Sequence, residues 1–196
     1  MALAALSLNW VSDDTMLQVL LLMNIPEAAT RPNIAHYEGQ QLKSICLGMS
    51  ARGVLLTRPT LSYLYVYKLL SRWLLQSDVG ENFSFTSITI NVNHASAVHR
   101  DQGNTGLSVG RVLGDFYGGQ LCYFPNDDGK MPLHLLSESE ECLVNTSDFF
   151  LLDGKKAHSV KPFEGERVSV IFFTTESSME PGASKELDFL AEWQAQ

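Results

Sequence analysis

Residues 87–124, SITINVNHASAVHRDQGNTGLSVGRVLGDFYGGQLCYF, decide the fold of this 196-residue chain. They continue an alternation of apolar and polar residues that starts earlier, in FSFTSITINV from residue 83 to 92. A period of two residues is typical of a β-strand with one buried face. The alternation slips once, near Thr86 and Ser87, which indicates either a bulge or an error in the assigned strand.

Further short strands are predicted after this one, separated by turn signals such as Gly118-Gly119 and Asp153-Gly154. About seven short strands with frequent turns favour a sandwich or barrel, including the double-sheet jelly roll. The predicted strands are residues 107–113, 120–124, 142–145, 149–152, 158–163 and 167–174.

The sequence on either side of the strands predicts helices. Residues 13–23 place acidic residues before leucines, as at a helix start, and residues 59–76 (PTLSYLYVYKLLSRWLLQ) show apolar spacing of three to four. Residues 184–193 predict a short closing helix. We therefore expect one α+β domain: mainly helical support in residues 1–80, a jelly-roll core in residues 81–176, and a C-terminal helix in residues 177–196.

The composition is that of a globular protein, with 45% hydrophobic and 18% charged residues. The formal net charge of −8 lowers the expectation of a nucleic-acid partner, because phosphate contacts normally require a basic surface. The apolar run at residues 16–23 is far shorter than the roughly 20 residues of a membrane span. We expect a soluble intracellular protein, in the nucleus or cytoplasm, with no membrane partner.

Two histidines and one aspartate in the strand-rich half are of the right type to hold a metal ion. His99 and Asp101 form a His-x-Asp pair, and residues two apart on an extended segment point to the same side. His158 stands at the start of a predicted strand. Two imidazoles and one carboxylate are the ligand set of non-haem iron(II) oxygenases, whose open positions admit an oxo-acid and O2. The pattern predicts an Fe(II) site.

Arg167 follows His158 by nine residues, and Ser169 follows Arg167 by two. If both lie on the last strand, they face the same way. A guanidinium fork matches a carboxylate in two bonds, and a neighbouring hydroxyl adds a third. This pair is what a dicarboxylate co-substrate needs at the end remote from the metal.

Two asparagines alternate with apolar residues on the strand that leads to the predicted metal loop. If Ile90 and Val92 face the outer core, Asn91 and Asn93 face the cavity. Both are therefore candidates for co-substrate contacts.

The stretch quoted first, followed by DFFLLDGKKAHSVKPFEGERVSVIFF from Asp148, resembles the Fe(II)/2-oxoglutarate-dependent dioxygenase superfamily over about residues 83–175. The resemblance implies a double-stranded β-helix core, a cupin-like form of the jelly roll, with helices packed on one face. It also implies Fe(II), 2-oxoglutarate and O2 as cofactor and co-substrates, with ascorbate in support. The implied reaction hydroxylates a C–H bond and converts 2-oxoglutarate to succinate and CO2.

Within the superfamily, the motif His99-Arg100-Asp101-x-x-Asn104 is similar to the TET/JBP group, which oxidises 5-methylpyrimidine bases in DNA. The resemblance implies that Asn104 contacts the base, although Gly103-Asn104 is also good turn chemistry. Arg100, between the two metal ligands, is a further candidate for substrate contact. The spacing from His158 to Arg167 is more like that of prolyl hydroxylases, and the Cys-rich zinc region of animal TET proteins is absent.

Three functions therefore stay open. The first is an oxygenase acting on a DNA base, the second a peptidyl hydroxylase of prolyl type, and the third a non-catalytic cupin-like binding module. The third is disfavoured because all three metal ligands and Arg167 are present.

Overall fold

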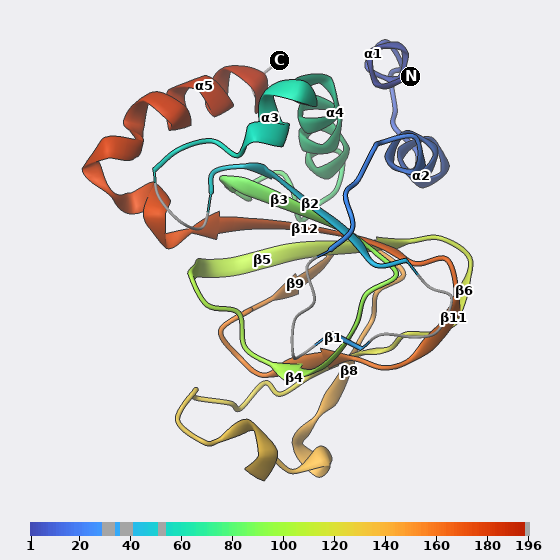
Figure 1. Cartoon of the computed structure of the whole chain (residues 1–196), viewed down its shortest axis with the longest axis vertical. Helices are drawn as coiled ribbons and strands as arrows, with labels where there is room; N and C mark the ends of the chain where they lie inside the picture. Colours follow the sequence, from blue (N-terminus) through green and yellow to red (C-terminus); the bar gives the residue numbers. More distant parts are fainter. Residues whose placement is uncertain (29–33, 36–40, 51–53, 195–196) are drawn as a thin grey trace.

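The computed structural model describes residues 1–28, 34–35, 41–50 and 54–194, and it folds them into a layer of helices over two antiparallel sheets (Figure 1). The expected mixture of helices and antiparallel sheets is thus confirmed. The helices are α1 (Ala2–Ala5), α2 (Asp13–Leu21), α3 (Arg58–Ser62), α4 (Leu64–Leu75) and α5 (Ser184–Gln194), with short turns η1 (Leu133–Leu135), η2 (Glu138–Glu140), η3 (Glu176–Met179) and η4 (Pro181–Ala183).

The first sheet lies under the helices and has the strand order β2-β3-β12-β5-β9. Alternate residues of its central strands, among them Ile90 and Val170, join the main hydrophobic core on the helix side. Their neighbours in sequence, such as Asn91 and Ser169, therefore face the second sheet. The strands are β2 (Lys43–Gly48), β3 (Ser87–Val92), β12 (Val168–Thr175), β5 (Asn104–Leu113) and β9 (Phe150–Leu152).

The second sheet has the order β1-β4-β10-β7-β8. A smaller apolar cluster joins the two sheets, because Val112 and Phe150 of the first pack with Leu121 of the second. A separate pair, β6 and β11, lies at one end of both sheets. The strands are β1 (Ile34–Ala35), β4 (Ala95–His99), β10 (His158–Val160), β7 (Leu121–Tyr123), β8 (Cys142–Val144), β6 (Phe116–Gly118) and β11 (Phe163–Gly165).

The helices bury one apolar side against the first sheet. α2 begins after Ser12, whose hydroxyl accepts a hydrogen bond from the Thr15 N–H at 3.2 Å, and this cap stabilises the helix start. Tyr67 and Leu70 of α4 are fully buried in the main core. The helices predicted at residues 13–23 and 184–193 correspond to α2 and α5. Among the described residues, every helix falls short of the length and apolar character that crossing a bilayer requires.

The helix predicted across residues 59–76 is interrupted at Tyr63, which separates α3 from α4 with φ −122° and ψ 31°. In α3, just before this break, the hydroxyl of the fully buried Thr60 accepts a hydrogen bond from the Gly48 N–H at 2.8 Å. This bond holds α3 on the end of β2, so the chain changes direction before α4 begins.

The N-terminal part, expected to be mainly helical, also supplies strands to both sheets. β2 pairs with β3 from Lys43 opposite Val92 to Gly48 opposite Ser87. β1 pairs with β4 in the second sheet. The segment KSICLG is short, does not alternate clearly between apolar and polar residues, and pairs with a strand that is remote in the sequence, so it carries little local signal. The segment 1–80 thus contains α1 to α4 as its main elements and, in addition, two strands that the sequence analysis did not predict.

The slip in the alternation of residues 83–92 marks the true start of β3. The strand begins at Ser87, and both Phe85 and Ile88 pack in the helix-side core although they are three residues apart. Residues 83–86 form an irregular segment that leads into the sheet. The first part of the apolar–polar pattern therefore lies in this segment, and only the second part lies in the strand.

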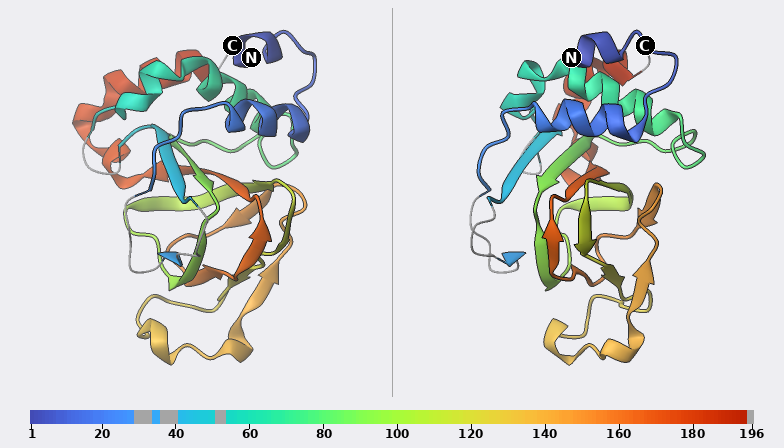
Figure 2. Two further views of the ribbon diagram at one scale, coloured as in Figure 1. Left: turned by 45° about the vertical axis from the view of Figure 1, so that its right-hand side comes forward. Right: turned by 90° about the vertical axis from the view of Figure 1, so that its right-hand side faces the viewer.

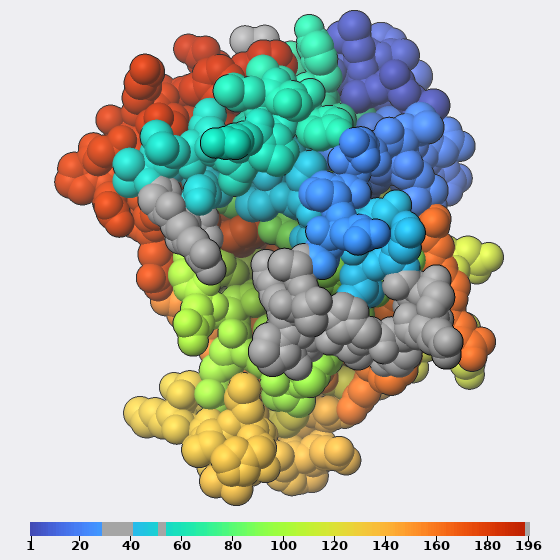
Figure 3. Space-filling model, in the orientation of Figure 1, coloured from blue at the N-terminus to red at the C-terminus, as the bar shows by residue number. Residues whose placement is uncertain are grey.

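A projection between β7 and β8 extends from the end of the molecule remote from the helices, as Figures 2 and 3 show. It carries η1 and η2, and most of its side chains are exposed. Its base reaches back to β4, because the Met131 carbonyl accepts a hydrogen bond from Arg100 at 2.8 Å.

Candidate metal centre

The structure brings the three predicted metal ligands together at one end of the second sheet. His99 is the last residue of β4, His158 is the first of β10, and the antiparallel register places them opposite each other. Asp101 follows just beyond β4. One ligand atom of each residue lies within 4.8 Å of the others, and the two Nε2 atoms are 3.7 and 4.0 Å from the carboxylate oxygens. We call this set the metal triad.

Backbone carbonyls fix the tautomer of both imidazoles. Nδ1 of His99 lies 2.9 Å from the Ala97 carbonyl oxygen, and Nδ1 of His158 lies 2.9 Å from that of Lys156. A carbonyl oxygen only accepts, so each Nδ1 carries the hydrogen and each Nε2 keeps its lone pair. Bonds of this kind orient histidines that bind metals. Both Nε2 atoms are therefore available as ligands.

The environment of His158 favours the neutral imidazole. The residue is only 6% exposed, and this burial lowers its pKa below the ordinary value of 6.5. The Asp101 carboxylate acts in the opposite direction, while His99 lowers the pKa further. Because a histidine must be deprotonated at the ligating nitrogen, burial prepares His158 to bind a cation.

Asp101 is held through both its backbone and its carboxylate. Its N–H donates to the Gly154 carbonyl at 2.7 Å, and the Asn104 amide donates to Oδ2 at 3.3 Å. A Cβ atom at Gly154 would lie 2.9 Å from Oδ2, so glycine alone leaves the carboxylate its place. The sequence indicated only a turn at Asp153-Gly154. The contact of Gly154 with Asp101 was missed, since it depends on the packing of two loops that are remote in the sequence.

The two predicted substrate contacts both bond to groups within the protein. Asn104 is buried at the start of β5, with its amide against Asp101. Arg100 donates to Asp127 from Nε at 2.7 Å and from a terminal nitrogen at 2.6 Å. Contacts of Asn104 and Arg100 with a substrate stay predictions, while their bonds to Asp101 and Asp127 hold the segment that carries His99 and Asp101.

Arg167 lies immediately before β12 and is only 3% exposed. Its guanidinium carbon is 5.6 Å from the centre of the Phe116 ring and 5.8 Å from that of Phe163. Among the described residues, its buried Nε has no hydrogen-bond partner. Burial lowers the pKa of Arg167 to about 10. A buried charge without a counter-charge is costly, so this environment favours the binding of an anion.

Polar side chains continue along the inner face of the first sheet. Ser169 stands opposite Asn91, and Asn91 stands opposite Ser44, in adjacent strands. Val168 packs in the helix-side core. Its two neighbours in the sequence, Arg167 and Ser169, therefore lie on the opposite, inner face of the sheet. The Ser44 hydroxyl donates to Asn91 Oδ1 at 2.7 Å, which leaves the amide nitrogen of Asn91 available as a donor. Ser44 was not predicted as part of this row, because β2 was not.

Asn93 fastens the backbone of Arg167. Its N–H donates to the Arg167 carbonyl at 2.8 Å, and its Oδ1 accepts from the Arg167 N–H at 3.0 Å. The residue has φ of +61°, a conformation that asparagine tolerates better than most residues. The co-substrate contact of Asn93 stays a prediction, and the oxygen of its amide is already engaged in placing Arg167.

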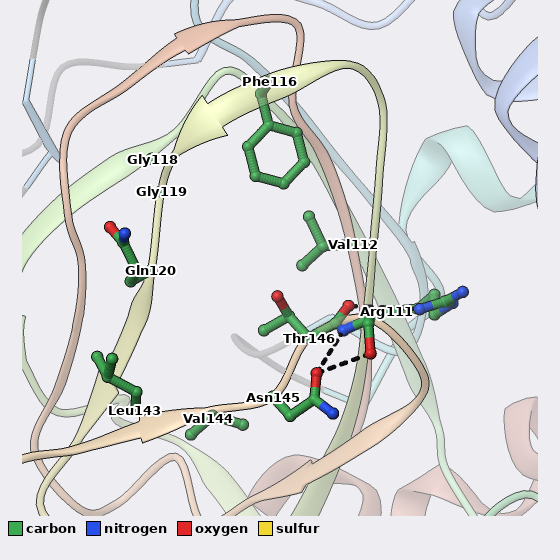
Figure 4. Close-up of a pocket in the computed structure, with 11 residues that line it drawn as sticks. Arg111, Val112, Phe116, Gly118, Gly119, Gln120, Leu143, Val144, Asn145 and Thr146 are labelled. Atoms are coloured by element: carbon green, nitrogen blue, oxygen red, sulfur yellow. Dashed lines mark hydrogen bonds between the residues drawn. The ribbon is translucent and has the colours of Figure 1, made fainter.

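A cavity of about 490 Å³ opens between the end of β5 and β6 on one side and β8 with the segment that follows it on the other (Figure 4). Phe116 and Gly119 line it, and both also approach Arg167: a Cβ atom on Gly119 would lie 3.2 Å from the arginine Nε. The inner wall of the cavity is therefore made by residues that pack around the guanidinium. The sequence indicated a turn at Gly118-Gly119 but not this contact.

No protein-family model and no curated protein matches the chain. Among solved structures, it is similar to an oxidoreductase of the 2OG-Fe(II) oxygenase family from Burkholderia pseudomallei, with 14% identity and a TM-score of 0.47 over 85% of this chain and 82% of that one. It is also similar to a prolyl-4-hydroxylase from Pseudomonas putida, with 18% identity, a TM-score of 0.37 and coverage of 69% and 70%. A predicted oxalate decarboxylase from Thermotoga maritima gives 10% identity, a TM-score of 0.33 and coverage of 78% and 99%. Similarity at this level assigns neither a family nor a reaction, so the chemistry has to follow from the site itself.

Proposed function

We propose that the chain is an Fe(II)/2-oxoglutarate-dependent dioxygenase that hydroxylates a C–H bond. The observation that carries the proposal is the combination of the metal triad with Arg167, a buried cation whose Nε lacks a partner among the described residues. The first can hold a divalent metal, and the second can hold the far carboxylate of a dicarboxylate.

The metal triad suits iron(II) by the kind and number of its donors. Two neutral imidazoles and one carboxylate leave open positions on a six-coordinate ion, as in non-haem iron oxygenases. When bound, Fe(II) would supply the activation of O2. The protein's own part is to present both Nε2 atoms and the Asp101 carboxylate, fixed by the Ala97, Lys156 and Gly154 carbonyls.

The residues around Arg167 suit the remote carboxylate of 2-oxoglutarate. A guanidinium binds a carboxylate through two parallel hydrogen bonds, and it does so most strongly where water is excluded. Ser169 and Asn91 follow on the same inner face and offer a hydroxyl and an amide to the co-substrate. We assign Asn93 a positioning role, since both its bonds go to the Arg167 backbone.

We propose further that the two sheets form a double-stranded β-helix. Along the chain, β3, β5, β9 and β12 of the first sheet alternate with β4, the adjacent pair β7 and β8, and β10 of the second, so the chain crosses repeatedly from one sheet to the other. This winding brings the ends of β4 and β10 together in one sheet, with Arg167 just before β12 in the other. In this arrangement the metal and the anion would both be bound in the space between the two sheets.

The electrostatics favour a peptide over a DNA base as the substrate. The chain carries a net charge of −8, and the projection next to Arg100 exposes Asp128, Glu138 and Glu140. Such a surface repels phosphates. In the motif that resembles the TET/JBP group, Asn104 was the residue implied to contact the base, and its amide lies against Asp101. We therefore rank a peptidyl hydroxylase first and a 5-methylpyrimidine oxidase second.

The test of the reaction is turnover of 2-oxoglutarate to succinate by purified protein with Fe(II), O2 and ascorbate. Even without a substrate, slow uncoupled succinate formation is expected, and Asp101→Ala should abolish it. Peptide libraries and methylated oligonucleotides are then offered in parallel as substrates. Mass spectrometry of the products shows which of them has gained the mass of one oxygen atom. Absence of both iron binding and succinate would favour the non-catalytic cupin-like module.

A further inference from the structure

A buried ion pair stands next to the metal triad and takes no part in ligating the metal. Arg100 lies between the two ligands of the His-x-Asp motif, and its guanidinium grips Asp127 in a two-bond fork, at 2.7 and 2.6 Å. The Asp127 side chain is only 1% exposed, and that of Arg100 is 19% exposed. The pair is therefore shielded from water far more than an ordinary surface salt bridge.

Asp127 also bonds to the second strand that carries a metal ligand. Its Oδ2 accepts from the Ala157 N–H at 2.6 Å, and Ala157 immediately precedes His158. Its Oδ1 accepts from the Gly129 N–H at 3.1 Å, which closes the turn around the carboxylate. One carboxylate thus connects the residue between His99 and Asp101 with the residue before His158.

We propose that Arg100 and Asp127 form a clamp that sets the distance between the two halves of the metal triad. The inference deepens the proposed function and rests on it, because the clamp matters only if the triad binds a metal. Without the clamp, two connections would remain between the β4 and β10 segments at this end. They are the pairing of His99 with His158 in the sheet and the hydrogen bond from the Asp101 N–H to the Gly154 carbonyl. The ion pair adds a third connection that reaches both ligand segments at once.

Fixed geometry is the property that an ion pair of this kind supplies best. A buried pair contributes little net stability compared with apolar side chains of similar volume, because both charges lose their hydration. The planar guanidinium and the carboxylate nevertheless accept only one relative orientation when both bonds form. Residues that orient metal ligands from outside typically change metal affinity by about 10- to 100-fold when replaced.

The clamp is tested by Co(II) titration of the purified protein, followed by the ligand-field absorption of the bound ion. Asp127→Asn keeps the size of the side chain and one acceptor oxygen but removes the charge. Asp128→Asn is the matched control, because it makes the same change at the next residue, where the carboxylate is exposed and pairs with Lys130 at 3.0 Å. Arg100→Lys keeps the positive charge and removes the fork. The unfolding temperature of each metal-free variant is measured alongside.

We expect Asp127→Asn to raise the Co(II) dissociation constant at least about tenfold and to change the ligand-field spectrum. Asp128→Asn should stay within about twofold of wild type, and Arg100→Lys should fall between the two. Combining Arg100→Lys with Asp127→Asn should add little to the larger single effect, because both changes break one clamp.

The proposal is overturned if Asp127→Asn and Arg100→Lys bind Co(II) as tightly as wild type, even when they unfold at a lower temperature. That result would leave the pair a purely structural contact. If Asp127→Asn does not fold, the Arg100→Lys titration decides alone. Failure of wild type itself to bind Co(II) would instead refute the metal site, and with it the proposed function.

Discussion

Replacing Arg167 with methionine should separate the stability of the fold from the binding of the co-substrate. A pKa lowered from 12.5 to about 10 corresponds to roughly 3 kcal/mol by which burial disfavours the charged guanidinium. Methionine removes that cost. It also loses the contacts with the Phe116 and Phe163 rings, worth on the order of 1–2 kcal/mol. The unfolding free energy of the metal-free variant should therefore equal or exceed that of wild type.

The effect on 2-oxoglutarate has the opposite sign. A carboxylate bound in a dry site without its cation loses about 2–5 kcal/mol of binding free energy, which raises the dissociation constant roughly 30- to 4,000-fold. Binding is measured calorimetrically with Mn(II) in place of iron, and stability by urea unfolding. Lys185→Met, which removes an exposed cation on α5, is the control and should change neither quantity. If Arg167→Met bound 2-oxoglutarate as wild type does, the assignment of the anion site would be wrong.

Three further predictions concern the metal end of the site. His99→Ala and Asp101→Ala should each abolish metal binding, read from the bound metal content, with little change in the circular dichroism of the fold. Gly154→Ala should weaken Co(II) binding about tenfold, since its Cβ atom would lie 2.9 Å from a ligand oxygen, and an unchanged titration would contradict that contact. Hydrogen bonds from Arg100 and from the Gly129 and Ala157 N–H groups together lower the pKa of Asp127 to about 2, so the stability that they provide is present above about pH 4 and is lost as the pH falls toward 2. Urea unfolding between pH 5 and 2 should show a steeper loss of stability in wild type than in Asp127→Asn.

Most strands of the second half of the chain could be predicted because their signals are local, although β6 (Phe116–Gly118) was not among them. Residues 107–113, 142–145 and 167–174 combine alternation with flanking turns, and they correspond to β5, β8 and β12. The prediction at residues 158–163 merged two strands, because the turn between β10 and β11 contains no glycine. β2 escaped prediction since its evidence is its partner, and so did the break at Tyr63, which follows a bond from Thr60 to another element.

The residues of the site also fall into two groups: those that could be predicted from their residue type, and those whose role depends on packing. His99, Asp101, His158 and Arg167 have side chains whose chemistry suggested a metal and an anion at once. Gly154 and Asp127 carried no such signal, because a turn glycine and a turn aspartate are common everywhere in proteins. Their meaning depends on which loops meet, and that is fixed by the pairing of β4 with β10.

The two ends of the site are prepared for opposite charges by different physical means. At the metal end, carbonyl bonds at Nδ1 of both imidazoles leave each Nε2 as the available ligand atom, and burial of His158 lowers its pKa and so favours its neutral form. At the other end, burial alone surrounds the Arg167 guanidinium with aromatic rings and leaves its Nε without a partner among the described residues. A ligand that chelates a cation with one end and presents a carboxylate at the other would relieve both conditions together. This complementarity, more than any single motif, is the physical reason to favour a 2-oxo dicarboxylate as the co-substrate.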